Sequence, residues 1–124
     1  MPRYFTHEEA NALLIEIHPV VEEIMRIHEV VVRRQPEAWP AIARAAGNGG
    51  SRAASQIVPE FERVRQLVHQ VQDQGVIVKD MGIGLLDFPS LRDGREVYLC
   101  WKYGEDQIDF WHDVDAGFMG RQPI

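Results

Sequence analysis

The spacing of apolar residues changes at Gly75, and this change constrains the fold more than any other feature of the chain. Before Gly75, apolar residues recur every three or four positions, which is the period of one helix face. They form two series: Leu13, Ile17, Val20, Ile24, Ile27 and Val31, then Ile57, Phe61, Val64, Val68 and Val71. After Gly75, apolar and polar residues alternate, as they do in strands. The order of the two patterns predicts an α+β domain.

The first helix is predicted to begin after Thr6. Thr6 and Glu9 match a capping box, in which the side chain of each residue accepts a hydrogen bond from the amide of the other. Pro19 lies inside the apolar series and has no amide hydrogen, so we expect a kink or a local break there. Glu22 and Arg26 have the spacing and order of a helical ion pair, which places that side of the helix toward water.

Residues 35–55 show neither period and are predicted to form a flexible connector, with room for one short helix that ends at the glycines after Ala46. The second apolar series predicts another long helix, which ends at Gly75 and packs antiparallel to the first. The helical part of the domain is therefore expected to be a hairpin within residues 6–73.

Four strands are predicted between residues 76 and 113. The second strand is expected to end before Pro89, which cannot donate a hydrogen bond, and Asp93 and Gly94 form a tight turn before the third strand. We infer a single domain over residues 1–124, in which an antiparallel helical hairpin packs on one face of a four-stranded antiparallel β-meander.

The alternation also predicts which face of the sheet each side chain occupies. In the fourth strand, His112 is expected to point toward the core. Trp111 is then expected on the face away from the helices, where Tyr98 of the third strand also lies. Trp111 and Tyr98 are therefore the predicted surface for a second copy of the chain or for another partner.

Arginines cluster near the predicted turns. Arg92, Arg95 and Arg121 are candidates for binding a carboxylate or phosphate group of a ligand at one end of the meander. Acidic residues nearby are equally placed to neutralise them as ion pairs. Both interpretations stay open at the level of the sequence.

The chain of 124 residues carries 13 basic and 19 acidic residues, a net charge of −6. An acidic surface disfavours nucleic acid and anionic membranes and favours cations or a basic protein partner. No secretory signal is visible at the start, so a soluble, cytoplasmic protein is expected. The single cysteine, Cys100, excludes an internal disulfide and a zinc site with several thiolates, and its place in mid-strand suggests a packing residue.

One segment has the composition of a metal site. His112, Asp113 and Asp115 combine an imidazole with two carboxylates, a set that suits Zn, Mn, Fe or Ni as a divalent ion. The candidates for a further ligand are Asp80, Asp87, His18 and His28. Neighbours in a straight strand face opposite ways, so sharing an ion requires the strand to end or bulge there. In the alternative, structural interpretation, His112 donates to a carboxylate or carbonyl group while the acids cap turns.

No complete catalytic constellation is visible in the sequence. The expected function is therefore a small soluble interaction or binding module that acts as a homo-oligomer, in the simplest case a homodimer. The alternative is a divalent-metal-binding protein, with hydrolysis as its reaction, whose site lies near residues 112–115.

Several segments also resemble a known family. They are Tyr4 to Thr6, Glu9 to Leu14, Gly75 with Val76, Val78 to Asp80, Gly84 to Pro89, Arg92 to Trp101 and Phe110 to Asp113. They are similar to the bacterial domain of unknown function 2203 family over nearly the whole chain except the connector. The resemblance implies a bacterial source and a small cytoplasmic protein, but no activity, cofactor or catalytic residue.

Overall fold

The computed structural model describes residues 3–34, 36–47 and 61–124. The helices are α1 (His7–Arg34), α2 (Trp39–Gly47) and α4 (Phe61–Gln72), with short 3₁₀ helices η1 (Pro36–Ala38) and η2 (Phe118–Gly120). The strands are β1 (Ile77–Asp80), β2 (Leu85–Arg92), β3 (Arg95–Lys102), β4 (Phe110–Asp113) and β5 (Gln122–Pro123). The predicted connector lies partly outside the described residues, so its flexibility stays a prediction.

The α+β class is confirmed, but the prediction of four strands is wrong. The described residues form a single antiparallel sheet of five strands in the order β1-β2-β3-β4-β5. The fifth strand pairs only two residues with β4, and a strand of this length leaves no alternating pattern in a sequence.

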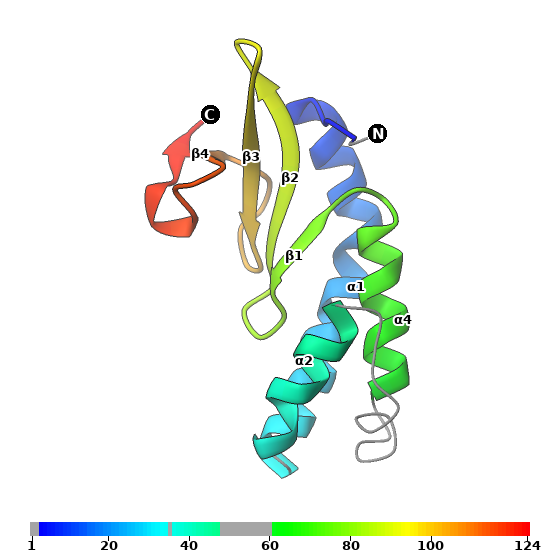
Figure 1. Cartoon of the computed structure of the whole chain (residues 1–124). Coiled ribbons are helices and arrows are strands. Elements are labelled where there is room, and N and C mark those ends of the chain that lie inside the picture. Colours follow the sequence, from blue (N-terminus) through cyan, green and yellow to red (C-terminus); the bar gives the residue numbers. More distant parts are fainter. Residues whose placement is uncertain (1–2, 35, 48–60) are drawn as a thin grey trace.

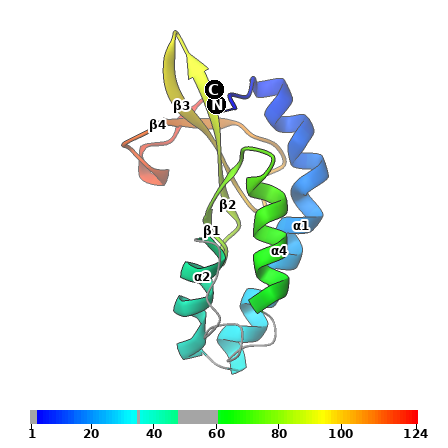
Figure 2. The same ribbon diagram turned by 45° about the vertical axis from the view of Figure 1, so that its right-hand side comes forward.

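The two longest helices, α1 and α4, lie on one side of this sheet (Figures 1 and 2). α1 and α4 contact each other and lie side by side in both views. α2 contacts α4 near the C-terminal end of α1. None of the helices in the described part of the chain combines the length and apolar composition that a membrane crossing requires.

The start of α1 confirms the predicted capping box. The amide of Thr6 donates to Glu9 Oε1 over 2.8 Å, and the amide of Glu9 donates to Thr6 Oγ1 over 3.1 Å. The helix continues through Pro19 without a break. The predicted ion pair between Glu22 and Arg26 is wrong, because Arg26 pairs with Glu23 instead. Glu22 accepts a hydrogen bond from the Tyr103 hydroxyl over 2.6 Å. A residue of the turn after β3 thus binds the carboxylate that the helical pattern had assigned to Arg26.

The core lies between the helices and the sheet face that points toward them, which we call the inner face. The inner face contributes Leu86, Phe88, Val97, Leu99 and Trp101, all buried. The helices contribute buried Leu13, Ile17, Val21, Ile24 and Ile27 from α1 and Val64, Val68 and Val71 from α4. The inner face is therefore covered by α1 and α4, and the opposite face, which we call the outer face, points away from these helices.

The prediction that the second strand ends before Pro89 is wrong. β2 continues to Arg92, and Pro89 lies opposite Tyr98 of β3. On its other side the pairing with β1 extends only to Asp87, so no strand there needs an amide hydrogen from Pro89. The chain start fills that place instead, because the Phe5 amide donates to the Pro89 carbonyl over 2.7 Å.

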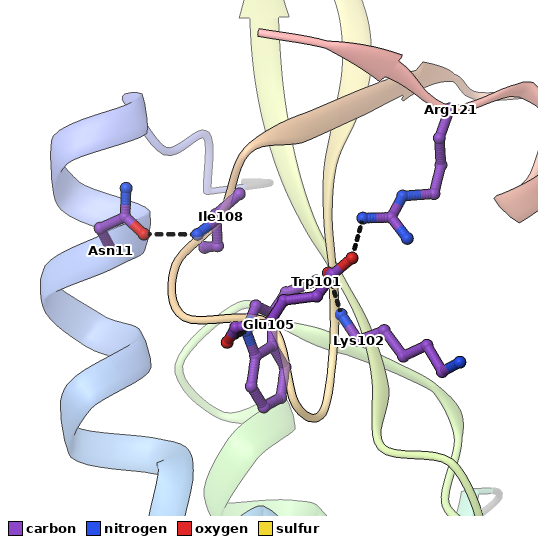
Figure 3. A network of polar contacts seen from close by, with 6 residues as sticks. All are labelled: Asn11, Trp101, Lys102, Glu105, Ile108 and Arg121. Carbon is purple, nitrogen blue, oxygen red and sulfur yellow. Dashed lines mark hydrogen bonds and ion pairs between the residues drawn. The ribbon is translucent and has the colours of Figure 1, made fainter.

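The predicted facing of the fourth strand is also wrong. Trp111 lies opposite Leu99 and is buried on the inner face, whereas His112 lies opposite Tyr98 on the outer face. The prediction treats Ile108, Phe110 and His112 as one alternating series, but β4 begins only at Phe110, so the buried Ile108 does not indicate which face of β4 meets the core. Ile108 belongs to the preceding loop, where its amide donates a hydrogen bond to Oδ1 of Asn11 in α1 over 2.8 Å (Figure 3).

The capping box gives a first prediction. Replacing Thr6→Ala removes the acceptor for the Glu9 amide and should lower the free energy of unfolding by about 1 kcal/mol in urea titrations. Thr6→Ser keeps the hydroxyl and serves as the matched control, with a clearly smaller loss expected. Equal losses in both variants would mean that the cap contributes nothing to stability.

Candidate functional site

A buried cluster of three metal-ligating side chains lies on the outer face of the sheet. Asp87 of β2, Cys100 of β3 and His112 of β4 each place one ligand atom within 4.8 Å of the others. Their exposed fractions are 2%, 0% and 2%. A carboxylate such as that of Asp87 is rarely buried unless it is paired, so its partners decide what the cluster can do.

The strand register brings these three residues together. Asp87 lies directly opposite Cys100, and His112 lies opposite Tyr98, the neighbouring outward residue on the same strand. Directly opposed and diagonal side chains on one face are close enough to interact. The cluster therefore follows from the pairing of three adjacent strands.

Hydrogen bonds fix the His112 ring. The carbonyl oxygen of Asp113 can only accept, so Nδ1 of His112 carries a hydrogen and donates to it over 2.8 Å. Nε2 of His112 lies 3.0 Å from Asp87 Oδ1, and this contact also requires one proton, on either the imidazole or the carboxyl group. With either placement the pair has zero net charge, which lowers the cost of its burial. A carbonyl and a carboxylate are the partners that the structural interpretation of His112 expected.

The Cys100 thiol is held in its neutral form. Burial, followed by the nearby Asp87 carboxylate, raises the pKa of Cys100 from 9.0 to about 12, although the charge of Arg121 acts in the opposite direction. A thiol with this pKa is not a nucleophile at neutral pH. Without a cation, the cluster is therefore a neutral, hydrogen-bonded unit.

The final part of the chain lies on the outer side of the cluster. We call residues 114–124 the cover segment, and they lie across the sheet from α1 and α4 (Figures 1 and 2). The Arg121 guanidinium lies 4.0 Å from the ring centre of Phe110, which is the residue opposite Cys100. Arg121 also pairs with Glu105 over 2.6 Å (Figure 3). These contacts place Arg121 beside the cluster, close enough for its charge to act on the Cys100 thiol.

Tyr98 closes another side of the cluster. Its ring meets that of His112 edge to face, with centroids 5.6 Å apart. Burial, followed by the charges of Glu96 and Asp87, raises the pKa of Tyr98, so the phenol stays protonated and neutral. The residue lies on the outer face, as predicted, but is only half-exposed.

The structure does not bring the other predicted ligands to the His112 side chain. Asp113 pairs with Arg95 over 2.9 Å, and Asp115 is exposed to solvent. Asp80 accepts hydrogen bonds from the turn amides that follow it. His18 stacks on Tyr103 of the turn after β3, and His28 packs against Trp39. Of the predicted residues, only Asp87 joins His112.

The structure does not form the predicted partner surface of Trp111 and Tyr98. Trp111 is buried on the inner face and cannot form an exposed surface with Tyr98. Of the three predicted arginines, Arg92 lies over the Trp111 ring, 4.6 Å from its centre. Arg95 and Arg121 pair with different acids, Asp113 and Glu105. Ion pairing and stacking, rather than a common anion site, account for these side chains.

Cys100 is the cluster member that sequence reasoning assigned to packing alone. A signal was present, because the turn residues Asp93 and Gly94 pair Arg92 with Arg95. Asp87 precedes Arg92 by five residues (92 − 87) and Cys100 follows Arg95 by five (100 − 95), so the turn places them opposite each other. No similar count reaches His112, because a long loop separates β3 from β4.

The fold and site define a small α+β protein with a covered polar cluster on the outer face of its sheet. The chain belongs to the family described as uncharacterized conserved protein (DUF2203), whose family model matches residues 3–124. No curated protein and no solved structure matches the chain.

The raised pKa of Cys100 predicts a loss of stability in alkali. The folded state keeps the thiol protonated to about pH 12, while the unfolded chain ionises near the ordinary value of 9.0. The contribution is fully present below pH 9 and is lost as the pH rises toward 12, by up to about 1.4 kcal/mol per pH unit. Urea unfolding with chelator present should show a steeper decline for the wild type than for Cys100→Ala. Parallel curves for the two proteins would contradict the assignment.

Proposed function

We propose that this protein binds one divalent transition-metal ion at Asp87, Cys100 and His112. The observation that carries the proposal is the convergence of a carboxylate, a thiol and an imidazole within 4.8 Å, all buried and from three adjacent strands. Metal sites built on paired strands are held more precisely than sites on loops. The ligand set differs from the one that the sequence suggested, although His112 is common to both.

Charge balance supports a divalent ion. Without a metal, the cluster holds one proton between Asp87 and His112 and another on the Cys100 thiol, and its net charge is zero. An ion of charge +2 that displaces both protons meets one carboxylate, one thiolate and one neutral imidazole, and the sum is again zero. Binding therefore exchanges one divalent cation for two protons without leaving net charge in a buried site.

The ligand types select the class of metal. A thiolate with an imidazole favours zinc or a later first-row ion such as iron, cobalt or nickel over magnesium and calcium, which prefer oxygen. Three protein ligands leave one position of a tetrahedral ion for water, which is the arrangement that hydrolytic zinc sites use. A bacterial cytoplasm is part of the proposal, because a reducing compartment keeps Cys100 available as a thiol.

A panel of variants tests this site against the one predicted from sequence. Native mass spectrometry with Zn²⁺ should show one ion per chain, and Co²⁺ should give the charge-transfer absorption of a thiolate ligand. Asp87→Asn, Cys100→Ser and His112→Ala should each weaken affinity by more than about 100-fold, since even outer partners of ligands contribute about 10- to 100-fold.

Asp113→Asn and Asp115→Asn are the matched controls. Both should bind as the wild type does, because the contact of His112 with Asp113 uses only the backbone carbonyl. Retained binding in all three cluster variants, or no stoichiometric binding by the folded wild type, would overturn the proposal.

A homo-oligomeric interaction module is the second candidate function. The cover segment contains three exposed apolar side chains, Met119 at 92%, Val114 at 43% and Phe118 at 38%. Exposed apolar side chains that lie together are typical of surfaces that bind another protein.

The candidate predicts that this segment lies in a homodimer interface. Met119→Asp should convert a dimer into a monomer in native mass spectrometry, because the charge would have to be buried against apolar groups. Ile15→Asp is the control, since Ile15 is 78% exposed but lies on α1. A wild-type protein that is monomeric at every concentration tested would exclude the homodimer.

A further inference from the structure

The buried cluster of Asp87, Cys100 and His112 has no exposed path for an ion from solvent in the described part of the structure. Its three side chains are at most 2% exposed, so neither an ion nor a reagent reaches them without a movement of the chain. On the inner side, the sheet is packed against α1 and α4 through the buried core. On the outer side, Arg121 of the cover segment lies over Phe110, the residue opposite Cys100, and its charge acts on the Cys100 thiol. Movement of this segment would therefore uncover the side of the sheet on which Cys100 lies.

Few interactions hold the cover segment in place. β5 contributes two paired residues, and the Ile124 amide donates to the Asp109 carbonyl over 2.9 Å. Lys102 of β3 lies over the Phe118 ring, 6.0 Å from its centre. The charged link is Arg121, which bonds to Glu105 over 2.6 Å and lies close to the rings of Phe110 and Phe118. Segments with so few buried contacts open at a lower free energy than the whole domain.

The two sides of this link differ in how firmly they are held. Glu105 is fixed to β3, because its carboxylate accepts the Lys102 amide over 2.8 Å and its carbonyl accepts the Trp101 indole N–H over 2.9 Å (Figure 3). Arg121 belongs to the cover segment, and its buried Nε finds no acceptor among the described residues. Water can satisfy this Nε when the segment moves outward, which reduces the cost of opening.

We propose that the Arg121–Glu105 pair is a latch that closes the cover segment over the Asp87–Cys100–His112 cluster and controls the entry of metal ions. The latch itself follows from the packing. Its role in metal entry rests on the proposed metal-binding function.

Cys100 provides a direct measure of opening, because it is the only cysteine of the chain. The metal-free, full-length protein is treated with N-ethylmaleimide in the presence of chelator, and the labelled fraction is followed by mass spectrometry. Arg121→Gln and Glu105→Gln should each increase the labelling rate by about tenfold or more, as expected for the loss of a charge-assisted, partly buried hydrogen bond. If the pair acts as one unit, the double variant should be little faster than either single variant.

Two controls separate opening from other effects. Arg95→Gln removes the exposed ion pair with Asp113 and should leave the labelling rate unchanged. Loss of the positive charge at Arg121 disfavours the thiolate and would slow the chemical step, whereas loss of the negative charge at Glu105 would favour it. Acceleration in both variants therefore reports opening rather than thiol reactivity. Rates that do not change in low urea show that the opening is local and not global unfolding.

The release of Zn²⁺ to an excess of chelator completes the test. Faster release from the latch variants, together with faster labelling, would support the proposal in full. Unchanged labelling in folded Arg121→Gln and Glu105→Gln would overturn the latch even if Zn²⁺ binds. Faster labelling in a protein that binds no Zn²⁺ would support the latch as a structural device and refute its role in metal entry along with the proposed function.

Discussion

The tight turn at Asp93 and Gly94 sets the pairing of the two longest strands, and the rest of the sheet is built outward from that pair. Both residues have positive φ angles, 54° and 77°, as a two-residue hairpin turn with the twist of its strands requires. A slip of one residue would turn the side chains of one strand to the other face. Either β2 or β3 would then point its core residues away from α1, and Asp87 and Cys100 would lie on opposite faces of the sheet. The apolar core and the polar cluster therefore depend on the same register.

The polar cluster is tolerated on this sheet because it is electrically neutral. Asp87 and His112 share one proton, and the pKa of Cys100, raised to about 12, keeps the thiol uncharged. A single ionised group at this depth would cost several kcal/mol. The same neutrality is preserved when a divalent ion replaces two protons, so one set of side chains is compatible with a closed metal-free state and with a metal-bound state.

Local rules predicted the local parts of this fold well. The capping box at Thr6 and Glu9, the change to strands after Gly75 and the turn at Asp93 depend on residues a few positions apart. The predictions that failed depend on distant partners. β2 passes through Pro89 because the chain start, rather than a strand, lies beside it. The prediction for Trp111 and the outer face failed because Ile108 is not part of β4. Ile108 lies in the preceding loop, where its amide donates a hydrogen bond to Asn11 of α1.

The sequence by itself determined the α+β class, the helix start, the hairpin register and hence the opposition of Asp87 and Cys100, since each is set by backbone preferences and periodicity over short distances. Only the tertiary structure decided that His112 lies against Asp87, that Asp113 forms an ion pair with Arg95 and that Asp115 is exposed to solvent. The physical reason is that the third member comes from a strand whose register is set by a long loop and by contacts to α1 and Arg121. Pairing across such a loop is fixed by packing of the whole domain and not by any local pattern.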